Sequence, residues 1–82
     1  MRVKVRLFAR LRDIAGASEV ECDVPVAATI GDVWATLVIR HPDLAVYASS
    51  LSCAHNEEYA PMNAVLVDGD EVAFLPPVSG GS

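Results

Sequence analysis

The sequence has few of the residue types from which catalytic and metal sites are built. It contains two histidines and two cysteines, and it has no GxSxG, HExxH or glycine-rich phosphate-binding motif. Cys53 and His55 would share a strand face, but with Cys22 as a third ligand they lack the close pairing of metal ligands. A hydrogen-bonded histidine explains His55 better. We therefore expect no catalytic residue, no metal site and no bound cofactor.

The sequence also lacks a long apolar run and an opening signal peptide, so we expect no membrane association. Cys22 and Cys53 are too few and too far apart for a disulfide framework. Reduced thiols in a cytoplasmic protein explain them most simply, and a Cys22–Cys53 disulfide is the alternative. With 52% apolar residues in 82 positions, the chain has enough material for one small domain with a real core.

Basic residues are scarce and unevenly placed. Five of the six lie within the first twelve residues, whereas the eleven acids from Asp13 onward are accompanied only by Arg40. An acidic surface repels phosphates, so we expect no nucleic-acid partner. The same surface favours a protein partner with a basic face.

Apolar residues alternate with polar ones over residues 2–8 and 18–24, which predicts two strands. A short helix or turn over residues 9–16 would connect them as an antiparallel hairpin, with Gly16 ending it. Phe8 falls on the polar side of the first strand, so we expect it to pack under the following turn or to be exposed.

The main helix is predicted to begin after Thr29 and to end near Arg40 or His41. Thr29 and Asp32 have the spacing of a capping box, and Pro42 would end the helix. A second short helix is expected within residues 42–52. The apolar stripe of the main helix consists of Ile30, Val33, Trp34, Leu37 and Val38.

The remaining strands are expected at residues 51–55 and 71–75, and the second of these is apolar enough for the sheet interior. Residues 56–59 are predicted to form a turn that reverses the direction of the chain. Residues 68–71 read as a turn with a solvated acidic rim, because they lack the twelve-residue pattern of a calcium loop.

These elements predict an α+β domain in which a mixed sheet packs on one main helix, as in the ubiquitin-like β-grasp. We place the domain at residues 1–75 and an extended, flexible diglycine tail at residues 76–82. Two prolines end the last strand, and the glycines let a partner close tightly around the backbone. Residues 76–81 of this tail would span roughly 20 Å when extended, which suits insertion into a partner. A frayed terminus or a linker is the alternative.

Three stretches resemble the MoaD family, the sulfur-carrier small subunits of molybdopterin synthase within the wider MoaD/ThiS ubiquitin-like group. They are LFARLR at residues 7–12, NEEY at residues 56–59 and DGDEVAFLPPVSGG at residues 68–81. The resemblance spans essentially the whole chain, and the third stretch is the most specific.

The resemblance implies a carrier that is not an enzyme by itself. A MoeB-type E1-like adenylyltransferase would use ATP to adenylate Gly81, and a sulfurtransferase would supply sulfur for a thiocarboxylate. The tail would then insert into a MoaE-type large subunit and donate sulfur to cyclic pyranopterin monophosphate. The tail residues implied in positioning and threading are Pro76, Pro77, Val78, Ser79 and Gly80. Phe8 and Leu75 are implied in partner contacts, with core packing as their alternative role.

One departure is Ser82, which follows the second glycine, where the family ends. A protease removes Ser82, or it is an added residue, or this form is inactive as a carrier. Two further functions remain open. One is sulfur delivery for thiamine or cysteine, or ubiquitin-like protein modification. The other is an interaction module that is never activated, for which Ser82 is the natural terminus.

Overall fold

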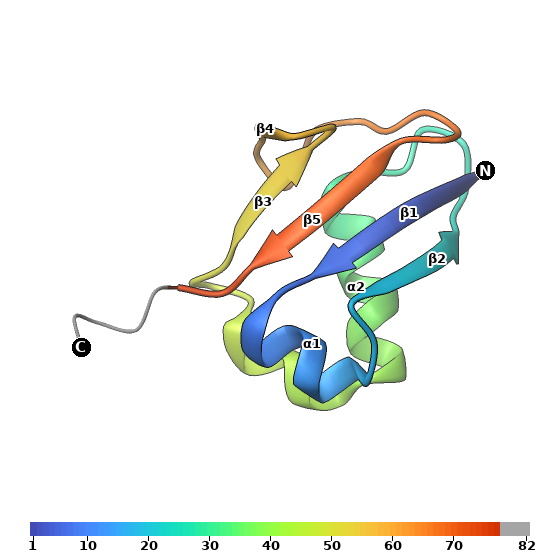
Figure 1. Cartoon of the computed structure of the whole chain (residues 1–82). Helices are drawn as coiled ribbons and strands as arrows, with labels where there is room; N and C mark the ends of the chain where they lie inside the picture. The colour runs from blue at the N-terminus through green and yellow to red at the C-terminus, as the bar shows by residue number, and fades with distance from the viewer. Residues whose placement is uncertain (78–82) are drawn as a thin grey trace.

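A computed structural model describes residues 1–77 as a five-stranded sheet packed on one long helix (Figure 1). Residues 78–82 lie outside the described part. The elements in chain order are β1 (Arg2–Leu7), α1 (Ala9–Ala15), β2 (Glu19–Asp23), α2 (Ile30–Arg40), the 3-10 helix η1 (Pro42–Tyr47), β3 (Ser52–His55), β4 (Glu58–Tyr59) and β5 (Glu71–Leu75).

The strand order is β2-β1-β5-β3-β4, so the last long strand lies in the interior of the sheet as predicted. β1 pairs with β2 in antiparallel and with β5 in parallel orientation, and β5 pairs with β3 in antiparallel orientation. The parallel neighbours are connected through α2, which gives the predicted mixed sheet. This topology confirms the β-grasp arrangement.

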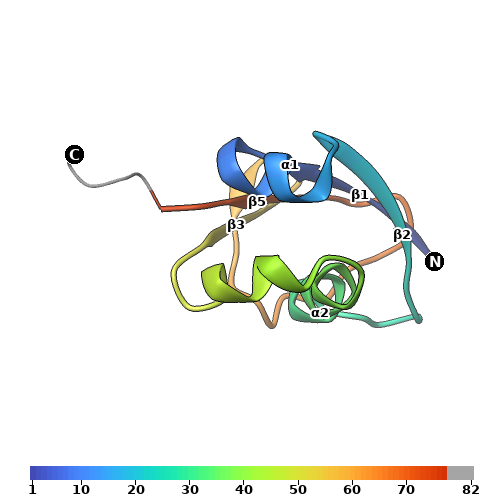
Figure 2. The same ribbon diagram turned by 90° about the horizontal axis from the view of Figure 1, so that it is seen from below.

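α2 covers one face of the sheet, and Figure 2 shows the two layers nearly edge-on. The predicted capping box is present, because the Asp32 N–H donates to Thr29 Oγ1 at 3.2 Å and the Thr29 N–H donates to Asp32 Oδ2 at 2.9 Å. Trp34 is buried, and its ring centroid lies 5.0 Å from that of Phe74 on β5. The helix therefore joins the centre of the sheet through an aromatic pair.

The central strands each bury one apolar face, which packs against α2. Val3, Val5 and Leu7 of β1 are all at most 1% exposed. Cys22 and Cys53 are buried free thiols, so the alternative of a disulfide between them is wrong. Burial raises the pKa of both thiols.

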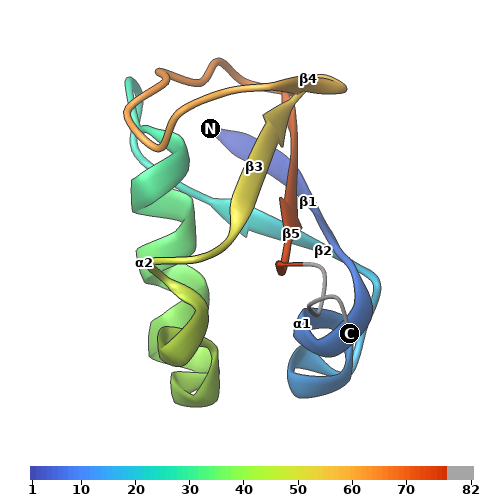
Figure 3. The same cartoon turned by 90° about the vertical axis from the view of Figure 1, so that its left-hand side faces the viewer.

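The short helix α1 ends at Gly16, as predicted, in the left-handed conformation (φ 77°), where its N–H donates to Arg12 O at 2.8 Å. Figure 3 shows α1 at the end of the sheet where β1 ends, apart from α2. The second predicted helix is the 3-10 helix η1, which buries Leu44. No described helix is long and apolar enough to cross a membrane.

Candidate protein-binding face of the sheet

The face of the sheet that points away from α2 changes character along β5. Val72 and Phe74 are fully buried against the helix, whereas Glu71, Ala73 and Leu75 alternate with them and are half-buried on the other face. Because side chains on a strand alternate between faces, Leu75 lies outside the core. The core-packing alternative for Leu75 is therefore wrong.

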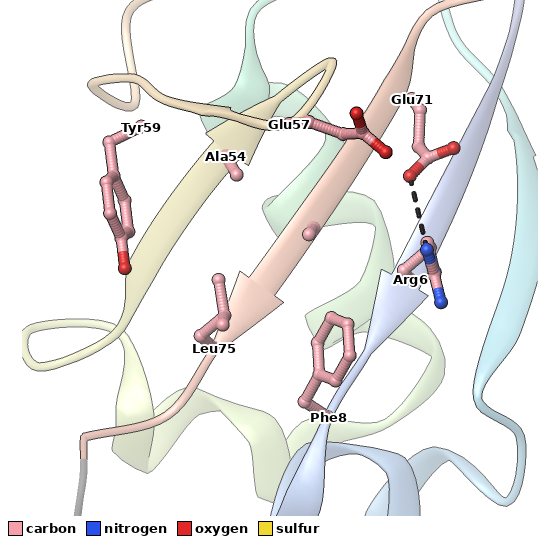
Figure 4. A pocket seen from close by; sticks show the side chains of 8 residues that line it. Arg6, Phe8, Ala54, Glu57, Tyr59, Glu71 and Leu75 are labelled. Carbon is pink, nitrogen blue, oxygen red and sulfur yellow. Dashed lines mark ion pairs between the residues drawn. The ribbon is translucent and has the colours of Figure 1, made fainter.

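Apolar side chains from β3, β4 and β5 and from the residue that follows β1 gather on this outer face around a hollow of about 270 Å³ (Figure 4). We call the apolar set the platform; it consists of Phe8, Ala54, Tyr59, Ala73 and Leu75. Its rim carries three charged side chains, Arg6, Glu57 and Glu71. An apolar centre with a polar rim is the usual anatomy of a protein–protein interface.

Phe8 directly follows β1, as the N-cap residue of α1, and is 37% exposed, so it belongs to the outer face and not to the core. The guanidinium carbon of Arg6 lies 5.5 Å from the centre of the Phe8 ring. A cation at this distance is attracted to the ring face, which helps to keep the ring on the platform. Of the two expectations for Phe8, exposure is confirmed.

A second hollow, of about 620 Å³, adjoins the platform and leads to the root of the tail. It shares Phe8 and Leu75 with the first hollow, and Tyr47, Pro76 and Pro77 also line it. The structure thus brings four of the predicted site residues together in one apolar surface: Phe8, Leu75, Pro76 and Pro77. The other four, Val78, Ser79, Gly80 and Gly81, lie outside the described residues.

The β1–β2 half of the outer face is charged, and its cations are paired. Arg2 Nε lies 3.3 Å from Asp23 Oδ1, and Lys4 Nζ lies 3.7 Å from Glu19 Oε2. Exposed pairs of this kind contribute only about 0–1 kcal/mol each to stability. Their consequence is electrostatic, because they neutralise the basic stripe of β1 and leave an acidic surface.

Asp70 corrects the expectation of a solvated acidic rim. It is only 8% exposed, and its carboxylate is hydrogen-bonded to His55 Nε2 at 2.6 Å, Val67 N at 2.9 Å and Asn56 Nδ2 at 3.2 Å. Burial alone raises the pKa of Asp70, but these hydrogen bonds outweigh it and lower the pKa below its ordinary value. The predicted hydrogen-bonded histidine is confirmed in the same cluster.

The Asp70 cluster holds the turn between β3 and β4 against the start of β5. The Asn56 N–H donates to Glu71 O at 2.8 Å, and the Glu71 N–H donates to Asn56 Oδ1 at 2.9 Å. Within residues 1–77, no group of three or more His, Cys, Asp or Glu side chains is placed to hold a metal ion. The hydrogen bonds of Asp70 and Asn56 make the cluster a structural clamp beside the platform.

Sequence comparison finds that a model of the ThiS family matches residues 5–81. The molybdopterin synthase sulfur carrier subunit of Chlamydomonas reinhardtii is 39% identical over 83 residues, covering 99% of this chain and 100% of that protein. Small archaeal modifier protein 1 of Haloferax volcanii is 38% identical over 84 residues, covering 93% and 97%. The crystal structure of SAMP1 from Haloferax volcanii matches with a TM-score of 0.87 and 36% identity, covering 99% of this chain and 100% of that one.

Proposed function

Because this chain belongs to the ThiS family, in the MoaD/ThiS ubiquitin-like group, we propose that it is the sulfur-carrier small subunit of molybdopterin synthase. The observation that carries the proposal is the whole-length similarity to sulfur carrier subunits of that synthase. The geometry is compatible with it, since β5 leads from the apolar platform to Pro76 and Pro77, the first residues of the tail that contains the diglycine sequence.

The chemistry would take place at the carboxylate of Gly81. A carboxylate is a poor acyl electrophile, so a partner of the MoeB type would adenylate it with ATP, releasing pyrophosphate. A sulfur nucleophile delivered by a sulfurtransferase would then displace AMP and leave a thiocarboxylate. In a complex with a MoaE-type large subunit, this sulfur would be transferred to cyclic pyranopterin monophosphate.

The folded domain would contribute binding and reach, and the partners would contribute the catalytic groups. The platform docks the domain, and the tail extends from Pro77 into the active site of the partner. A carrier has to leave the activating enzyme before it can load the large subunit. Because both partners must reach the same tail, we expect their binding sites on this domain to overlap at Phe8 and Leu75.

Ser82 provides the experiment that tests this proposal. In the full chain the carboxyl group of Gly81 is part of the peptide bond to Ser82, so it cannot be adenylated until Ser82 is removed. The chain ending at Gly81 should release pyrophosphate with the activating enzyme and ATP much faster than the full chain. Equal rates for the two forms would contradict the assignment of Gly81 as the acyl group.

Protein modification is the second candidate, because one of the most similar proteins is a small archaeal modifier. In that case an amine of a target protein, and not sulfur, would displace AMP from Gly81. Within this chain the only lysine amine that could serve as such a target is that of Lys4, which is paired with Glu19 on the sheet. Cell extracts would distinguish the two functions, since a modifier accumulates as amide-linked conjugates and a sulfur carrier as a free thiocarboxylate.

A further inference from the structure

Glu57 occupies a backbone position that does not suit its side chain. Asn56 (φ 50°) and Glu57 (φ 74°) form the two-residue turn between β3 and β4. A hairpin turn with positive φ at both central residues strongly prefers Asn-Gly, because a Cβ atom is strained in the left-handed region. Asn56 satisfies this preference and Glu57 does not, so the turn itself does not explain the glutamate.

The turn cannot relieve this strain easily, because the Asp70 clamp fixes it. Asn56 exchanges two hydrogen bonds with the backbone of Glu71 and gives a third to Asp70. The clamp therefore holds the backbone of the turn, and with it the Cα of Glu57, at the rim of the platform.

The Glu57 carboxylate points across the start of β5 toward Glu71 (Figure 4). Glu71 Oε2 is paired with Arg6 Nη1 at 3.6 Å, whereas Glu57 has no ion-pair partner among residues 1–77. Two carboxylates thus share this end of the hollow with the one cation of Arg6. The rim carries an excess negative charge directly beside the apolar centre.

We propose that Glu57 is a specificity-determining residue that binds an arginine of the partner protein, next to an apolar segment of that partner seated on the platform. The net charge of −5 agrees with a basic partner. An arginine fits better than a lysine, because its planar guanidinium pairs with a carboxylate through two parallel hydrogen bonds. This inference rests on the proposed function, which supplies the partner.

The test measures affinity for the MoaE-type large subunit of the same organism by titration calorimetry. Glu57→Gln keeps the shape and the strained backbone but removes the charge, and we expect affinity to fall about tenfold. Because salt screens such a pair, the loss should shrink at high ionic strength. Glu58→Gln is the matched control, since it makes the same change in net charge one residue away, outside the hollow, and should leave affinity unchanged.

Glu57→Gly separates a binding role from a structural one. It relieves the strain and removes the charge, so the unfolding midpoint should rise while affinity falls as in Glu57→Gln. Unchanged affinity in Glu57→Gln, with weaker binding by Phe8→Ala, would refute the arginine contact but leave the platform as the docking face. If the wild-type chain does not bind the large subunit, the proposed function and the Glu57 inference both fail.

Discussion

Removing the negative charge of Asp70 should destabilise the domain, although the group is almost completely buried. Three donors converge on this carboxylate: the Val67 N–H, the His55 ring and the Asn56 side-chain amide. In Asp70→Asn the new side chain keeps one acceptor oxygen and presents an NH₂ group to the donors. At least one donor loses its acceptor, and the turn that holds Glu57 loses part of its support.

The lowered pKa of Asp70 decides the sign of the effect. Burial disfavours the carboxylate, but the hydrogen bonds favour it more strongly, so the fold stabilises the ionised form overall. A buried donor without a partner costs about 1–3 kcal/mol, and hydrogen bonds to a charged acceptor lie at the upper end. We expect Asp70→Asn to lower the free energy of unfolding by about 2–3 kcal/mol at neutral pH, a large part of the ~4–12 kcal/mol typical of a domain of this size.

The same carboxylate predicts a pH dependence. Since the pKa of Asp70 is lower in the folded than in the unfolded protein, its contribution is fully present above the unfolded pKa of about 4. The contribution is lost as the pH falls from there through the folded pKa. Between neutral and strongly acidic pH, Asp70→Asn should therefore lose less stability than the wild-type chain.

Urea unfolding followed by the fluorescence of Trp34, the single tryptophan, measures these differences directly. Asp68→Asn is the matched control, because Asp68 lies in the same turn but is exposed, and asparagine retains an oxygen for the Arg2 N–H. The control should change stability by less than about 0.5 kcal/mol. An equal midpoint for Asp70→Asn and wild type would refute the assignment of Asp70 as a clamp.

Trp34→Ala should lower the free energy of unfolding by about 3–5 kcal/mol, because a buried aromatic pair is lost; circular dichroism in denaturant would measure it, and an unchanged midpoint would exclude Trp34 from the core. Phe8→Ala should weaken binding to the large subunit with little change in stability, whereas Val46→Ala, at a position 76% exposed and away from the platform, should affect neither. Gly81→Ala should block sulfur delivery but leave the unfolding midpoint unchanged, because the buried core of the described residues runs from Val3 to Phe74.

The main elements of the fold could be predicted because their signals are local. The capping box of Thr29 and Asp32 lies within four residues, and the alternation along β1 identifies its buried face directly. The interior position of β5 in the sheet followed from the apolar character of residues 71–75. In each case, short-range chemistry and the hydrophobic pattern lead to the same structure.

The clamp and the strained turn could not be predicted, because they depend on a contact between distant segments. The sequence around Asp70 has the polar character of an exposed turn, and only the pairing of β3 with β5 brings His55 and Asn56 to it. The positive φ of Asn56 was predictable from its side chain. That of Glu57 was not, because nothing in a glutamate favours the left-handed conformation.

Intact mass spectrometry of the protein purified from its native host tests the central claim most directly. A sulfur carrier predicts a species that ends at Gly81 and has one carboxyl oxygen replaced by sulfur, which would also show that Ser82 is removed. A single species that retains Ser82 with an ordinary carboxylate, in cells that are making molybdopterin, would contradict the carrier function.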